Sequence, residues 1–137
     1  MNRDEVDEAI AAWLTEASER PVGLAKAPED TSQSYAVMYP GVVMSFDGGD
    51  QDDAYSNKSF AYRIDCFGKD RKQCSWMSSR ILEVLIGRQD GDWASEPELD
   101  GLTLYWRQWI ACGPVEPSGP STYRSIDQYR LAIGPVS

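Results

Sequence analysis

The sequence predicts a single α+β domain spanning residues 1–137, with two helices packed on one face of a mainly antiparallel sheet in the order αββαββ. Two observations lead to this prediction. The chain has the usual length of one domain, and 42% of its residues are hydrophobic, which is enough to build a core. Along the chain, the spacing of apolar residues changes twice from the period of a helix to the two-residue period of strands.

The first predicted element is a helix near the N-terminus. Apolar residues recur there at intervals of three, four and seven, which places them on one helical face: Val6, Ile10, Trp13, Leu14 and Ala17. Asn2 can cap the start of this helix, with Glu5 in the capping-box position. Pro21, Gly23 and Pro28 exclude a continuation.

Two strands are expected next, joined as a hairpin. In the first, Tyr35, Val37 and Tyr39 alternate with their neighbours until residues 40–41 interrupt the pattern before residues 42–44. In the second, alternation runs through residues 60–66. The intervening segment, residues 47–53, is strongly acidic and contains two glycines, as turns often do.

A second helix should follow Gly68. Asp70 can cap it, Gln73 holds the capping-box position, and Gly87 is a natural stop. Its apolar positions have helical spacing: Cys74, Met77, Ile81, Val84 and Leu85.

The remaining chain should add two strands. Residues 88–101 are expected to form a loop with five acidic residues. Residues 102–112 have the character of an aromatic-rich strand, for which mixed core and subunit-contact roles are expected. Prolines and glycines in residues 113–120 predict a rigid connection, and residues 127–133 alternate as the last strand.

The composition argues against an enzyme. The chain has no histidine, which removes the commonest general base and the commonest metal ligand. No phosphate-binding glycine motif is present, and pairs of carboxylates are expected by chance among 22 acidic residues. We therefore expect no catalytic residue, no cofactor and no metal. An enzyme that uses carboxylates is the least favoured class.

The charge and the cysteine content indicate what kind of protein this is and which compartment it occupies. There are 22 acidic and 13 basic residues, a formal charge of −9, so non-specific binding to nucleic acid is disfavoured. Cys66, Cys74 and Cys112 are odd in number and widely spaced, which predicts buried free thiols in a reducing compartment. The acidic N-terminus has no signal-peptide pattern and no apolar run is long enough for a membrane, so a soluble cytoplasmic protein is expected.

Three interpretations of the acidic segment at residues 47–53 remain open. It could be a solvated hairpin tip, a surface that borders something negatively charged, or a calcium loop. The calcium interpretation is the weakest, because the spacing is not that of an EF-hand. The acidic residues concerned are Asp47, Asp50, Asp52 and Asp53.

Three stretches of the chain resemble a known family. They are residues 35–40 (YAVMYP), residues 62–68 (YRIDCFG) leading into 73–85, and residues 107–115 (RQWIACGPV) followed by Tyr123 and residues 129–133 (YRLAI). Together they resemble the tail terminator proteins of long-tailed phages, especially those of actinobacterial hosts. The resemblance covers roughly residues 3–134, and its motifs are structural rather than catalytic.

The resemblance implies a virion protein that assembles in the host cytoplasm as a homohexameric ring. The ring caps the tail tube, stops its polymerisation and presents a surface to the head-side connector or stopper protein, while DNA passes through the pore without specific binding. No membrane is involved. On this basis Asp47, Asp50, Asp52 and Asp53 would line the pore or lie at the ring edge. The second acidic segment would face a partner, with Trp93 as an apolar anchor beside Glu96, Glu98 and Asp100.

Two alternative functions are kept open. A head-side connector or stopper also forms rings around DNA. An acidic interaction module, such as a DNA mimic or inhibitor, would act instead as a monomer or dimer.

Overall fold

The protein is described by a computed structural model over residues 2–45 and 57–136. Within these residues there are two helices, α1 (Arg3–Ser18) and α2 (Arg71–Ile86). The strands, in chain order, are β1 (Val22–Leu24), β2 (Tyr35–Ser45), β3 (Lys58–Gly68), β4 (Arg88–Gln89), β5 (Asp92–Trp93), β6 (Leu102–Cys112), β7 (Glu116–Pro117) and β8 (Tyr123–Pro135).

The expected αββαββ order with a mainly antiparallel sheet is wrong. The main sheet is mixed, with strand order β1-β2-β3-β8-β6 and β7 paired to one end of β8. β1 runs parallel to β2, with Val22 opposite Ala36, whereas the other pairs in this sheet are antiparallel. A second, two-stranded sheet is formed by β4 and β5, inside the segment expected to be a loop. The added strands have two or three residues each, too few for alternation to reveal them.

Local side-chain chemistry explains where both helices begin. The side chain of Asn2 accepts a hydrogen bond from the Asp4 amide at 2.9 Å, and Asp70 accepts one from the Gln73 amide at 2.8 Å. The Gln73 side chain in turn accepts from the Lys69 amide at 3.0 Å. These contacts confirm both predicted N-caps.

Nearby residues also determine where the two helices end. α1 stops at Glu19, which adopts a left-handed backbone with φ of 61°, shortly before Pro21. α2 stops at Gly87, whose amide donates to the Glu83 carbonyl at 2.9 Å. A Cβ at position 87 would lie 2.2 Å from that carbonyl oxygen, so only glycine fits this close approach.

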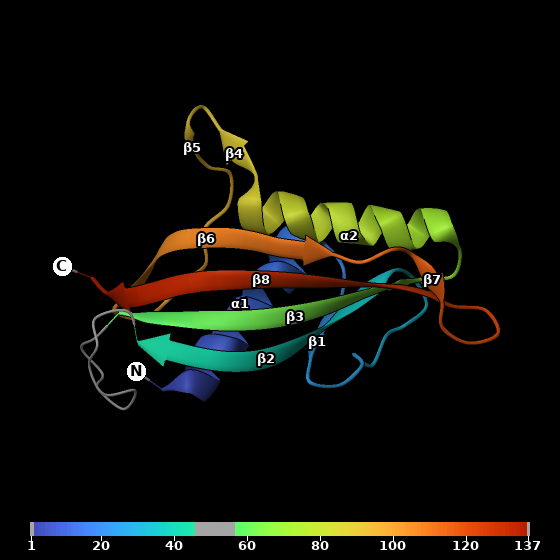
Figure 1. Ribbon diagram of the computed structural model, residues 1–137, viewed down its shortest axis with the longest axis horizontal. Helices are drawn as coiled ribbons and strands as arrows, with labels where there is room; N and C mark the ends of the chain where they lie inside the picture. The colour runs from blue at the N-terminus through green and yellow to red at the C-terminus, as the bar shows by residue number, and fades with distance from the viewer. Residues whose placement is uncertain (1, 46–56, 137) are drawn as a thin grey trace.

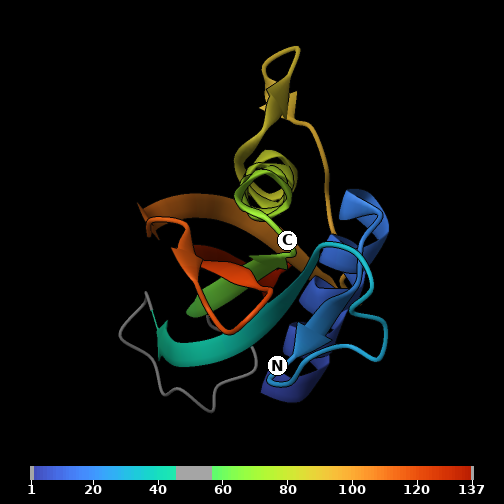
Figure 2. The same ribbon diagram turned by 90° about the vertical axis from the view of Figure 1, so that its right-hand side faces the viewer.

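The core lies between the concave side of the curved sheet and the two helices (Figure 2). α1 is fixed to the sheet by a buried polar contact as well as by apolar packing. The Tyr62 hydroxyl of β3 donates to Asp7 Oδ1 at 2.6 Å, and Arg3 forms an ion pair with the same carboxylate at 3.6 Å. Burial raises the pKa of Asp7, and the hydrogen bond from Tyr62 partly opposes that rise.

The connection from α2 to β6 leaves the body of the domain and then returns to it. The β4–β5 hairpin projects beyond α2, and the chain then descends between α1 and α2 to reach the start of β6 (Figures 1 and 2). We call residues 94–101 of this connection the strap. The strap and β6 carry the surfaces described below.

Candidate functional site

β6 forms one edge of the main sheet and exposes large apolar side chains. Among the described strands it pairs with β8 alone. Trp109 is 47% exposed and Ile110 is 45% exposed, and both lie on this edge strand. Soluble proteins usually shorten or charge such edges, because an unpaired strand with apolar side chains promotes association.

Two β-bulges shape this edge. Leu104 and Trp106 lie opposite consecutive residues of β8, and so do Trp109 and Ala111. Tyr105 and Ile110 are therefore the extra residues, and both side chains are more than 40% exposed. Bulges commonly redirect side chains at sheet edges, which explains why Tyr105 and Ile110 point outward here.

The opposite edge of the sheet is also partly apolar. β1 pairs only with residues 36–38 of β2, so the rest of β2 extends beyond it. Val42 and Met44 on that extension are 66% and 48% exposed. The two edges of the sheet thus differ in sequence, and each presents apolar side chains.

Arg107 points from β6 into the interior and holds the strap in place. Its side chain is fully buried, and it donates to the Leu85 carbonyl of α2 at 3.0 Å and to the Ser95 carbonyl of the strap at 2.8 Å. The guanidinium lies 5.2 Å from the ring of Trp13 and 3.7 Å from a carboxylate oxygen of Glu96. Burial lowers the pKa of Arg107 to about 10, while the charge of Glu96 opposes this shift. Arg107 therefore remains charged at neutral pH.

Trp93, the expected partner anchor, makes contacts within its own chain. The guanidinium of Arg88 lies 3.9 Å from the centre of its ring and that of Arg107 lies 4.5 Å away. The side chain is half-buried in β5. These contacts give Trp93 a role in fixing the hairpin, and its role toward a partner stays a prediction.

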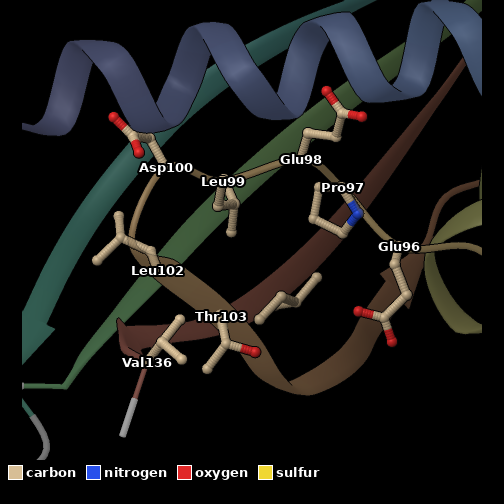
Figure 3. A pocket seen from close by; sticks show the side chains of 9 residues that line it. Glu96, Pro97, Glu98, Leu99, Asp100, Leu102, Thr103 and Val136 are labelled. Carbon is tan, nitrogen blue, oxygen red and sulfur yellow. The ribbon is translucent and has the colours of Figure 1, made fainter.

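The acidic residues of the strap line an open groove of about 800 Å³ beside the start of β6. Figure 3 shows the carboxylates of Glu98 and Asp100 extending toward α1, while Glu96 extends from the other side of the strap. Leu99, Leu102 and the 63% exposed Val136 supply apolar surface between them. The structure thus places all three predicted acidic residues around one hollow.

Two further hollows continue this groove along α1, between the helix and the strap. They add the carboxylates of Glu5 and Glu16 and the small side chains of Ala9 and Ala12. We call the whole feature the acidic groove. Its lining contains five acidic residues and, among the described residues, no lysine or arginine: Glu5, Glu16, Glu96, Glu98 and Asp100.

A second buried polar cluster surrounds Asp127 of β8, beneath α2. The Ser78 hydroxyl donates to Asp127 Oδ2 at 2.7 Å, and the Cys66 thiol lies 3.8 Å from the same oxygen. Burial raises the pKa of Asp127, with these hydrogen bonds opposing the shift. Burial likewise raises the pKa values of all three cysteine thiols, which makes them poor nucleophiles at neutral pH.

The cysteine prediction needs one correction. All three thiols are free, and Cys66 and Cys74 are buried, but Cys112 is exposed. Cys112 lies near the end of the edge strand β6, directly opposite Asp127, and its neighbours there leave it open to solvent.

Asp47, Asp50, Asp52 and Asp53 lie outside the described residues, so both the pore-lining and the calcium interpretations stay predictions. Within residues 2–45 and 57–136, no group of three or more acidic or cysteine side chains could hold a metal ion. No described helix is long and apolar enough to cross a membrane.

Comparison with known proteins leaves the family open. No protein-family model matches the chain, and no curated protein is similar to it at a significant level.

Proposed function

We propose that this chain is a non-enzymatic virion protein, a tail terminator that forms a ring on the end of a phage tail tube. The ring stops tube polymerisation and offers a surface to the head-side connector or stopper. DNA passes through its pore. The resemblance of residues 3–134 supplies this function and the number of six subunits.

The observation that best supports the proposal is the apolar edge of the sheet at β6. Trp109 and Ile110 place two large exposed apolar side chains on an edge strand in a chain of charge −9. A charge of this size opposes non-specific association, so an exposed apolar edge is best explained by a specific contact between subunits. The apolar part of β2, at the opposite edge, is a different surface. Contact between two unlike surfaces of neighbouring copies gives rings when the rotation closes.

The chemistry of the described residues agrees with a structural role. The chain has no histidine, and the pKa values of its thiols are raised by burial rather than lowered. The buried guanidinium of Arg107 donates to two backbone carbonyls and lies beside the ring of Trp93 within the chain. It acts as a support for the strap.

The test is genetic complementation of a phage that lacks this protein. Without the protein we expect tails of uncontrolled length, which electron microscopy measures directly. Normal free tails that fail to join heads would instead identify a head-side connector. Normal virions, together with a protein that stays monomeric or dimeric, would indicate an acidic interaction module.

A matched pair of edge variants tests the role of β6. The double variant Trp109→Gln/Ile110→Thr removes apolar surface without adding charge, and we expect it to lower ring formation and to leave tail length uncontrolled. Gln108→Thr changes an exposed polar residue between the same bulges and should retain both activities. Light scattering gives the oligomer mass, and circular dichroism verifies that each variant folds. Full activity of the double variant would contradict the role given to this edge.

A further inference from the structure

A basic and aromatic patch lies near the C-terminal end of α1. Trp76 of α2 is 44% exposed, and the guanidinium of Arg20 lies 4.8 Å from the centre of its ring. Lys72 lies one helical turn before Trp76 and is exposed. Together with Gln33, Ser34 and Gln73, these residues line a shallow hollow, and no acidic residue is among them. We call Arg20, Lys72 and Trp76 the basic patch.

The basic patch and the acidic groove have opposite charge, and the end of the groove that carries Asp100 lies at the far end of α1 from the patch. Glu5 and Asp100 line the groove at the N-terminal end of the helix, whereas Arg20 follows its C-terminal end. A helix of 16 residues is about 24 Å long. Lys72 and Asp100 of the same chain are therefore too far apart to touch while α1 is folded.

We infer that the acidic groove of one copy of this chain receives the basic patch of the next copy in the ring. The inference rests on the proposed ring assembly and identifies one contact that builds it. Trp76 would lie against the apolar surface formed by Leu99 and Leu102, and Arg20 and Lys72 would reach the carboxylates of Glu98 and Asp100. The groove supplies both the apolar area and the negative charge that this patch requires.

Charge also determines the arrangement of the copies. Two acidic grooves facing each other would place ten carboxylates in one interface, which like-charge repulsion disfavours. When the groove of one copy binds the basic patch of another, the contact joins two unlike surfaces. The pair of copies then still has one unoccupied groove and one unoccupied basic patch. Such a contact propagates from head to tail, as a ring requires.

The decisive experiment is zero-length cross-linking with a carbodiimide, which joins an amine to a carboxylate only when they touch. Equal amounts of ¹⁴N- and ¹⁵N-labelled protein are mixed, cross-linked and digested. We expect peptides of mixed label that join Lys72 to Glu98 or Asp100. Lys72→Arg keeps the charge but has no amine to couple, so it should lose this cross-link while retaining the oligomer mass. Absence of the mixed-label cross-link in the wild-type protein, or cross-links from the groove to lysines 26, 58 or 69 alone, would overturn the inference.

Charge reversal provides an independent readout. The variants Glu98→Lys/Asp100→Lys and Arg20→Glu/Lys72→Glu should each weaken self-association at least about tenfold, since each places like charges in the contact. Mixing the two should restore a hetero-oligomer, because both contacts between unlike variants join opposite charges: the unchanged patch meets the unchanged groove, and the reversed groove meets the reversed patch. Association of the wild-type protein should also weaken at about 1 M salt, where the Debye length is about 3 Å. Failure of the mixture to associate more strongly than either variant alone would count against the contact.

The outcomes separate this inference from the proposed function. A closed oligomer without the Lys72 cross-link would leave ring assembly in place and refute the groove contact. A protein that remains monomeric at every concentration refutes the contact as well. Tails of normal length in the phage lacking the protein would refute the proposed function, whatever the cross-link shows.

Discussion

Replacement of Arg107 by methionine should loosen the strap and markedly destabilise the fold. Methionine keeps most of the apolar length of the side chain but removes both hydrogen bonds, to the Leu85 and Ser95 carbonyls. Leaving a buried carbonyl without a donor costs about 1–3 kcal/mol. Loss of the desolvated cation beside Trp13 and Trp93 costs about 2 kcal/mol more.

Part of this loss is offset, because the variant no longer has to keep a charge in the interior. We expect a net decrease of about 3 kcal/mol in the free energy of unfolding. With a urea dependence of about 2 kcal/mol per molar for a domain of this size, the unfolding midpoint should fall by about 1.5 M. Tryptophan fluorescence in urea gives this midpoint directly.

The matched control is Arg88→Met. Arg88 also lies against the ring of Trp93 but is exposed, and its guanidinium donates to the nearby Gly91 carbonyl. The same chemical change there should cost about 1 kcal/mol or less. Equal midpoint shifts for the two variants would refute the reasoning, since burial of Arg107 is the basis of the larger value.

Three further predictions concern single side chains. Tyr62→Phe removes the 2.6 Å hydrogen bond to buried Asp7 and should lower the free energy of unfolding by about 1–3 kcal/mol in urea titrations; an unchanged midpoint would contradict this. Asp127 has a pKa raised above 3.8, so its contribution to stability is present below that pH and is lost as the pH rises through the folded value. The stability of Asp127→Asn relative to wild type should therefore increase between pH 3.5 and 7, and a pH-independent difference would refute this. Iodoacetamide should add one group to the native protein, at exposed Cys112, and three in denaturant, with mass spectrometry counting them.

The sequence was sufficient for the elements whose signals are local. Both helix starts followed from a capping residue, Asn2 or Asp70, and from apolar residues at helical spacing. Three of the four long strands were indicated by alternation over several residues, and β6 by its aromatic residues. The short strand β1 was not, because three residues carry no periodic signal and its parallel pairing depends on where β2 lies.

The surfaces were less accessible to sequence reasoning. Acidic residues on the strap were visible, but the groove also needs the flank of α1, which only the fold brings beside them. The basic patch joins Arg20 to Trp76 across 56 positions of the chain, and no local pattern links them. A single arginine within an apolar strand was the one available signal for Arg107. Its carbonyl partners lie 22 and 12 residues away and could not be inferred.

The two bulges of β6 limit how far an added strand can extend. Eleven residues of β6, Leu102–Cys112, lie opposite only nine of β8, so the spacing of the outer edge is interrupted twice. The longest stretch of β6 in regular register is residues 106–109, between the interruptions. Fibrils need long, uninterrupted ladders, and a four-residue pairing site does not provide one. The irregular edge therefore allows a finite assembly while resisting the endless stacking of sheets.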